Sequence, residues 1–119
     1  MSITIKNSFG VEPINEYGVE LAFYADLNLK EVVTLDELTK ENASLIRFPY
    51  KEELYPYGRA MSDYLDEKNL DVPEGERAKS FLANRGLLDD FYYSFWQEGV
   101  SELLLDWLVK HNLALEPSA

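Results

Sequence analysis

The apolar pattern in the last third of the chain constrains the fold most. Six large apolar residues recur there in pairs four positions apart: Leu87, Leu88, Phe91, Tyr92, Phe95 and Trp96. Spacings of three and four residues place side chains on one face of a helix. Gly99 interrupts this run, and Ser101 can cap a second segment that carries Leu104 and Leu108. The pattern therefore predicts two helices separated by a break at Gly99.

The N-terminal segment, residues 1–28, is of β type. Residues 2–6 alternate apolar and polar side chains, and residues 19–26 do so more clearly. In the second stretch Val19, Leu21, Phe23 and Ala25 share one face, which is typical of a strand. Because two strands alone are only marginally stable in water, this ribbon must pack on helices or pair with another chain.

Residues 34–112 are expected to be helical. Residues 34–37 have the form of a capping box, which predicts a helix that begins at Thr34 and ends before Pro49. Another helix is predicted from Tyr57 onward, and a third from Pro73 to Gly86, with residues 113–119 as a tail. The sequence thus predicts one domain over residues 1–119, of the α+β class and predominantly helical. Its short N-terminal β-ribbon would pack on about four to five helices.

The composition supports one hydrophobic core. The chain has 119 residues, of which 46% are hydrophobic and 13% aromatic, enough to bury a core without disulfide bonds. There is no cysteine, which excludes disulfides and thiolate chemistry and favours a reducing compartment. No secretory signal or membrane-spanning run is visible, so we expect a cytoplasmic protein.

The charge balance indicates what the chain binds. Twenty-two acidic residues against eleven basic ones give a net charge of −11. Such a surface repels phosphate backbones and anionic membranes, so we expect neither direct nucleic-acid binding nor membrane binding. A protein partner with a basic surface is expected instead. The alternative is that the charge only keeps the protein soluble.

No motif predicts catalysis, a metal site or a cofactor. His111 is the single histidine and lies at the end of a predicted helix, and no nucleophile elbow accompanies it. One histidine and no cysteine disfavour zinc. The acidic segment 63–76 lacks the spacing of a calcium-binding loop. A converging pair of carboxylates remains an alternative, but we predict that the chain is not an enzyme.

Two neighbouring segments carry the candidate partner-binding residues. Tyrosines around Pro49 and Pro56 suit an interface, because a ring supplies large contact area at little entropic cost. The segment 63–76 holds the densest run of acids. Core packing for the tyrosines and simple solvation for the acids are the alternatives. The candidates are Glu52, Glu53, Tyr55, Tyr57, Asp63, Asp66, Glu67, Asp71, Glu74 and Glu76.

Two functions fit these observations. The first is a small acidic binding or inhibitor protein that engages a basic groove of its partner, such as a nucleic-acid-handling enzyme. Phage inhibitors of nucleic-acid-targeting defence systems and immunity proteins against nuclease toxins share this physical character. The alternative is a structural or assembly subunit that forms homo-oligomers or hetero-oligomers, since an open ribbon edge can pair with another chain.

Overall fold

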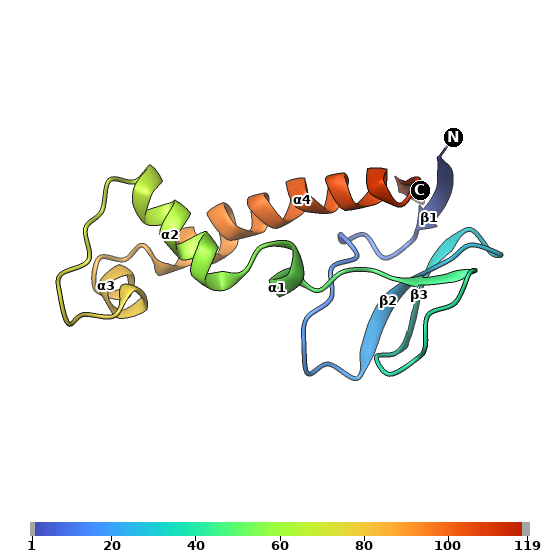
Figure 1. The fold of residues 1–119 in the computed structure, drawn as a ribbon, viewed down its shortest axis with the longest axis horizontal. Helices are drawn as coiled ribbons and strands as arrows, with labels where there is room; N and C mark the ends of the chain where they lie inside the picture. Colours follow the sequence, from blue (N-terminus) through green and yellow to red (C-terminus); the bar gives the residue numbers. More distant parts are fainter. Residues whose placement is uncertain (1, 118–119) are drawn as a thin grey trace.

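A five-stranded mixed sheet forms one end of the molecule, a group of helices forms the other, and one long helix joins them (Figure 1). The computed structural model describes residues 2–117. Its principal extents are 53 × 28 × 25 Å and its radius of gyration is 17.0 Å, against about 13.5 Å for a typical compact chain of this length. The molecule is therefore elongated, and the joining helix follows its long axis.

The chain forms four strands of the sheet first, then the helices, and returns to the sheet with the last strand. The strands are β1 (Ile3–Asn7), β2 (Leu21–Asp26), β3 (Glu31–Asp36), β4 (Leu45–Arg47) and β5 (Leu113–Pro117). The helices are α1 (Lys51–Leu54), α2 (Tyr57–Glu67), α3 (Ala78–Asn84), the π-helical segment η1 (Asp90–Trp96) and α4 (Gln97–Lys110). The strand order is β4-β2-β3-β1-β5. Strand β2 is antiparallel to β3 and β4, whereas β1 is parallel to β3 and β5.

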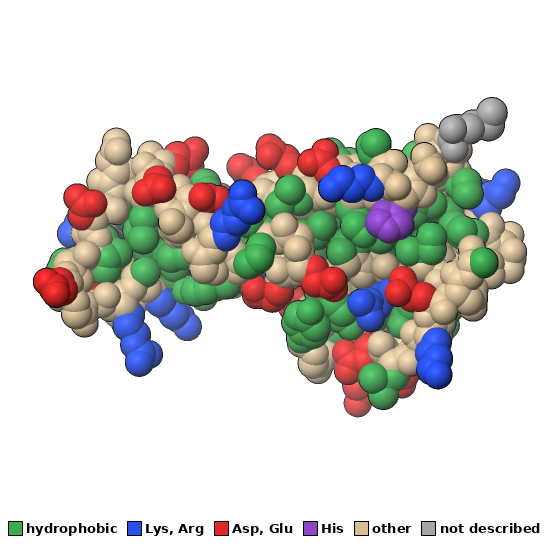
Figure 2. All heavy atoms as spheres, viewed as in Figure 1, with side chains coloured by type: hydrophobic (Ala, Val, Ile, Leu, Met, Phe, Trp, Pro, Cys, Tyr) green, Lys and Arg blue, Asp and Glu red, His purple; other side chains and the backbone are tan. Residues whose placement is uncertain are grey.

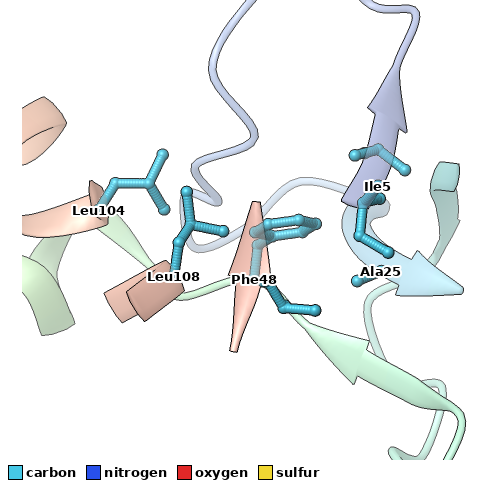
Figure 3. Close-up of a cluster of buried hydrophobic side chains, with 7 residues drawn as sticks. Ile5, Ala25, Phe48, Leu104 and Leu108 are labelled. Atoms are coloured by element: carbon cyan, nitrogen blue, oxygen red, sulfur yellow. The ribbon is translucent and has the colours of Figure 1, made fainter. Parts of the chain in front are cut away.

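The second half of α4 covers one face of the sheet. Leu104 and Leu108 belong to the same buried cluster as Phe48, which follows β4, and as Ile5 and Ala25 from the sheet (Figure 3). Each of the five is at most 4% exposed. Burial of side chains of this size stabilises the fold by about 1.5 to 3 kcal/mol each, alanine excepted.

A second core lies at the helical end and is rich in aromatic rings. Tyr64 of α2 meets Phe91 of η1 edge to face, with ring centroids 5.4 Å apart, and both side chains are fully buried. The Tyr64 hydroxyl donates a hydrogen bond of 2.7 Å to Asp90. This bond and the ring contact together fix α2 on η1.

Asn15 fastens the loop before β2 to the sheet and to the start of α1. Its side chain is 2% exposed. The amide nitrogen donates to the carbonyl oxygens of Phe48 and Phe23, and the amide oxygen accepts from the backbone N–H of Phe23. Its backbone carbonyl accepts from the N–H of Lys51, the first residue of α1. A buried amide with these partners satisfied fixes the direction in which α1 leaves the sheet.

The prediction of a predominantly helical domain with a short N-terminal ribbon is wrong. Residues 34–36 and 45–47, expected to be helical, belong instead to strands β3 and β4 of the sheet. The β-branched side chains of Val32, Val33 and Thr34 pack well on a pleated surface, and β3 pairs with β2 along its whole length. The Asp36 carboxylate accepts the N–H of Leu38 at 2.8 Å and so makes a turn after the strand instead of a helix start.

Two further predictions are also wrong: the C-terminal tail and the first residue of the helix expected from Pro73. The tail predicted over 113–119 contains β5, which pairs with β1 through five residues from Leu113 onward; residues 118–119 lie outside the described part. The helix expected from Pro73 begins only at Ala78. The strands within residues 1–28, the helix from Tyr57 and the end of α3 before Gly86 are confirmed.

Between residues 2 and 117, no helix is long and apolar enough to cross a membrane.

Candidate functional site

A groove of about 490 Å³ lies between α2 and the continuous helix formed by η1 and α4. We call it the acidic groove. Its apolar lining comes from Leu54, Tyr55, Phe95, Gly99 and Leu103. Its charged lining comes from Arg59, Asp63, Glu67, Glu98 and Glu102.

The floor of the acidic groove depends on a close approach between Gly99 and Tyr55. A Cβ atom on Gly99 would lie 2.5 Å from Cε2 of the Tyr55 ring, so only glycine, which has no Cβ atom, leaves room for the ring. Gly99 lies inside α4 and does not interrupt it, because the helix runs unbroken from Gln97 to Lys110. The predicted break at Gly99 is therefore wrong, and the glycine serves close packing instead.

Two further contacts hold Tyr55 in the floor. The indole N–H of Trp96 donates to the backbone carbonyl of Tyr55 at 2.9 Å, and the Tyr55 hydroxyl donates to the Asp63 carboxylate at 2.6 Å. Burial, the hydrogen bond to Asp63 and the negative charge of that residue raise the pKa of Tyr55 to about 12. The phenol therefore stays a hydrogen-bond donor well above neutral pH and orients the carboxylate.

The π-helical turn in η1 sets the positions of Phe95 and Trp96. A π turn closes i→i+5 hydrogen bonds and so holds more residues than an α turn. Side chains spaced by four then stay closer to one face than in a pure α-helix, which accounts for the pairs at 91–92 and 95–96. Phe95 faces the groove, whereas Trp96 is 5% exposed and packs in the helical core.

The walls of the acidic groove carry two pairs of like charges. Asp63 and Glu67 are four residues apart on α2, and Glu98 and Glu102 are four residues apart on α4. Acids at this spacing lie on the same helix face and repel each other, at a cost of about 0.2 to 0.5 kcal/mol per pair. The fold therefore concentrates negative charge from two helices on one groove, although each helix would be more stable without it.

Little positive charge offsets these acids. Arg59 is the one cation that lines the groove, so four carboxylates against one guanidinium leave a formal charge of −3. Within residues 2–117 the sole ion pair joins Arg47 to Glu53, away from the groove. Figure 2 shows acidic side chains along the stretch of surface over α2 and α4 on the visible face.

The groove combines spread carboxylates with an aromatic floor. Among the described residues, no three side chains of His, Asp or Glu come close enough together to hold a metal ion. His111 lies at the C-terminal end of α4, stacked on the ring of Trp107 at 4.1 Å, and does not line the groove. Spread carboxylates over an aromatic floor suit lysine or arginine side chains, whose stems pack on rings while their charged ends meet the acids.

The structure brings only three of the ten candidate residues together in this groove: Tyr55, Asp63 and Glu67. Glu52 and Glu53 serve helix ends instead, because their carboxylates accept the backbone N–H groups of Tyr57 and Tyr50. Tyr57 packs against the rings of the helical core. The remaining four candidates are exposed outside the groove: Asp66, Asp71, Glu74 and Glu76.

The ten candidate residues leave out the other half of the groove. Glu98 and Glu102 were not among the candidates, nor were Arg59, Phe95 and Gly99. The repeated i, i+4 acid spacing at 63/67 and 98/102 is a signal that is visible in the sequence. That the two pairs share one groove depends on how α2 packs on η1.

Comparison with known protein families, with curated proteins and with solved structures gives no match.

Proposed function

We propose that this protein is an acidic binding protein whose groove accepts lysine and arginine side chains from the surface of a protein partner. The observation that carries the proposal is the placement of two like-charged pairs, Asp63/Glu67 and Glu98/Glu102, on one groove. Like charges at this spacing destabilise their own helices. Binding a cationic side chain relieves that repulsion, so a basic partner gains affinity from an arrangement that costs the free protein stability.

The floor of the groove supports the same partner chemistry. The Tyr55 and Phe95 rings lie 6.5 Å apart between the acidic walls. An arginine or lysine stem can lie on such rings while its charged end reaches a carboxylate. A neutral apolar ligand would gain contacts with the rings. It would also remove water from the carboxylates without replacing the lost hydrogen bonds. The combination therefore favours long cationic side chains.

In its most specific form, the proposal is an inhibitor or immunity protein that acts on a nucleic-acid-handling enzyme. Such enzymes carry the basic surfaces that bind phosphate backbones. A net charge of −11 and a concentration of carboxylates on α2 and α4 are complementary to such a surface. Binding at that surface would exclude the nucleic acid, so the partner should lose nucleic-acid binding when the acidic protein is added.

The test is affinity capture from cells of the protein's own source with three versions of the chain. The groove variant Asp63→Lys/Glu67→Lys reverses one wall, whereas the control variant Glu16→Lys/Glu20→Lys makes the same charge change at exposed sites outside the groove. We expect one basic protein to bind the unmodified chain and the control. Its affinity for the groove variant should be about a hundredfold lower, and binding should weaken steeply as salt is added.

Any of three results would contradict the proposal. One is a partner that binds the groove variant as tightly as the unmodified chain. The second is recovery of the chain alone, and the third is a partner whose affinity does not change with salt. If a basic partner is found, competition with its nucleic acid in a gel-shift assay decides the more specific form.

The alternative, an assembly subunit, loses one of the observations that suggested it. That observation was an unfinished two-strand ribbon within residues 1–28, but its strands β1 and β2 belong to a five-stranded sheet in which β3 lies between them, β4 lies beside β2 and β5 lies beside β1. Sedimentation analysis of the unmodified chain is the direct measurement of self-association.

A further inference from the structure

We infer that the segment of the partner bound by this protein is a basic amphipathic helix lying along α4, with its cationic end in the acidic groove and its apolar end on Leu105 and Val109. This inference rests on the proposed function, because it takes the basic partner as given. It adds the helical conformation of the bound segment, the placement of its cationic and apolar ends, and its approximate length.

The exposed face of α4 carries both kinds of contact. Glu98, Glu102, Leu105 and Val109 follow one another at spacings of four, three and four residues, which places them on one stripe of a helix. Leu105 is 63% exposed and Val109 is 74% exposed. The opposite face of the same helix holds the buried residues Val100, Leu104 and Leu108.

The two exposed apolar residues extend the acidic groove toward the sheet. A single exposed leucine needs no explanation in a soluble domain. Here, however, Leu105 and Val109 are one turn apart and continue the line of Glu98 and Glu102. The helix buries Leu104 and Leu108 in the core of the sheet (Figure 3) and Val100 in the helical core. This apolar pair is thus the part of the stripe that a partner can still cover.

The stripe has the length of a short helix. Glu98 and Val109 are eleven residues apart on α4, which is about 16 Å at 1.5 Å per residue. A partner helix of about three turns spans that distance and presents anchors at i, i+3, i+4 and i+7. Side-chain ridges of two helices fit each other at such a contact.

Charge complementarity selects a basic protein segment over other occupants. A second copy of this chain would bring its own acids against Glu98 and Glu102, so the stripe repels itself. Nucleic acid and anionic lipid are repelled for the same reason. A basic helix instead pairs its cations with the groove and covers the apolar pair with its aliphatic side chains.

The experiment selects binders from a display library of random peptides of about 16 residues, long enough for three turns with flanking residues. The whole chain is the bait, and peptides that also bind the groove variant Asp63→Lys/Glu67→Lys are removed. We expect the selected peptides to carry lysine or arginine at one end and aliphatic residues at helical spacing toward the other. Circular dichroism should show that they gain helix on binding.

Matched variants then test the apolar end. Leu105→Ser/Val109→Ser changes two exposed side chains, so the fold should persist. We expect it to weaken binding of the selected peptides by about tenfold or more, from the lost apolar contact. Leu38→Ser is the control, since Leu38 is 84% exposed and lies outside α4, and it should leave the affinity unchanged.

The outcomes separate this inference from the proposed function. Suppose that charge reversal abolishes binding while Leu105→Ser/Val109→Ser leaves it unchanged. The partner then does not lie along α4 and the inference is wrong, but the proposal of a basic partner is still supported. Peptides that bind in an extended conformation also overturn it. If the library yields no peptide sensitive to charge reversal, the inference fails. The proposed function then depends on the capture experiment alone.

Discussion

Gly99 and Tyr55 approach so closely that a Cβ atom on Gly99 would lie 2.5 Å from Cε2 and 2.7 Å from Cδ2 of the tyrosine ring. The ring cannot yield freely, since its hydroxyl donates to Asp63 and the backbone carbonyl of the same residue accepts from Trp96. This contact between α4 and the end of α1 sets the floor of the acidic groove.

Gly99→Ala should therefore destabilise the protein. In an unobstructed helix the change would stabilise by up to about 1 kcal/mol. Here the added methyl group forces the Tyr55 ring out of place, and we expect a net loss of about 1 to 2 kcal/mol in the free energy of unfolding, measured with urea. In a Tyr55→Ala background the same substitution should become stabilising.

The matched control is Gly58→Ala in α2, where a Cβ atom would meet nothing within 4 Å. It should leave stability unchanged or raise it. If Gly99→Ala stabilises the protein as Gly58→Ala does, the close contact does not exist in solution.

Replacement of Asn15 should cost more than any surface substitution. Asn15→Ala leaves the Phe48 carbonyl and the Phe23 N–H without the side chain that pairs with them, whereas the Phe23 carbonyl keeps the N–H of Phe48, for an expected loss of about 3 kcal/mol. Asn15→Asp places a carboxylate against those two carbonyls, so the loss should be larger at neutral pH and smaller in acid, where the carboxyl is protonated. Asn84→Ala, at an exposed position, should change stability by less than about 0.5 kcal/mol. Equal losses for Asn15→Ala and Asn84→Ala would show that the buried hydrogen bonds of the Asn15 side chain do not stabilise the fold as described.

Two tyrosines should make the protein lose stability in alkali. Burial and a hydrogen bond to a carboxylate raise the pKa of Tyr55 and of Tyr64 to about 12, against 10.0 ordinarily. Between these values the folded protein keeps protons that the unfolded chain releases. The stabilisation is therefore fully present below pH 10 and is lost as the pH rises toward 12. Each such proton lowers the free energy of unfolding by about 1.4 kcal/mol per pH unit.

Urea unfolding at a series of alkaline pH values measures this slope. Tyr55→Phe and Tyr64→Phe should each make it shallower, whereas Tyr93→Phe, at a ring that is 78% exposed, should not. A slope that is the same in all four proteins would show that these two hydroxyls do not titrate as described.

Salt should stabilise the free protein. A net charge of −11 with one ion pair among residues 2–117 means that repulsion dominates the surface. Salt shortens the screening length from about 30 Å at 0.01 M to about 3 Å at 1 M, so we expect the melting temperature to rise over that range. Glu67→Lys should raise it at low salt and also weaken partner binding, because the repulsion and the binding surface share the same carboxylates. A melting temperature that is flat or falls with salt would contradict this account.

The sequence by itself determined the features that are local along the chain. Alternation over residues 19–26 predicted β2, and the apolar spacing from Tyr57 predicted α2, because each pattern follows from the geometry of one element. The acidic character follows from composition in the same way. At residues 34–37, however, a valid capping pattern competed with β-branched residues, and pairing with β2 decided the outcome.

Only the tertiary structure decided which residues form the groove. Glu98 and Glu102 are more than thirty positions from Asp63 and Glu67 in the chain, and no local pattern states that α2 packs on η1 so that both pairs line one groove. Gly99 illustrates the physical reason. In the sequence a glycine within a helical pattern predicts a break, but the ring of Tyr55, forty-four positions away, makes it the one residue that fits. Which residue fits at such a position depends on contacts between distant segments, and these contacts form only when the chain is folded.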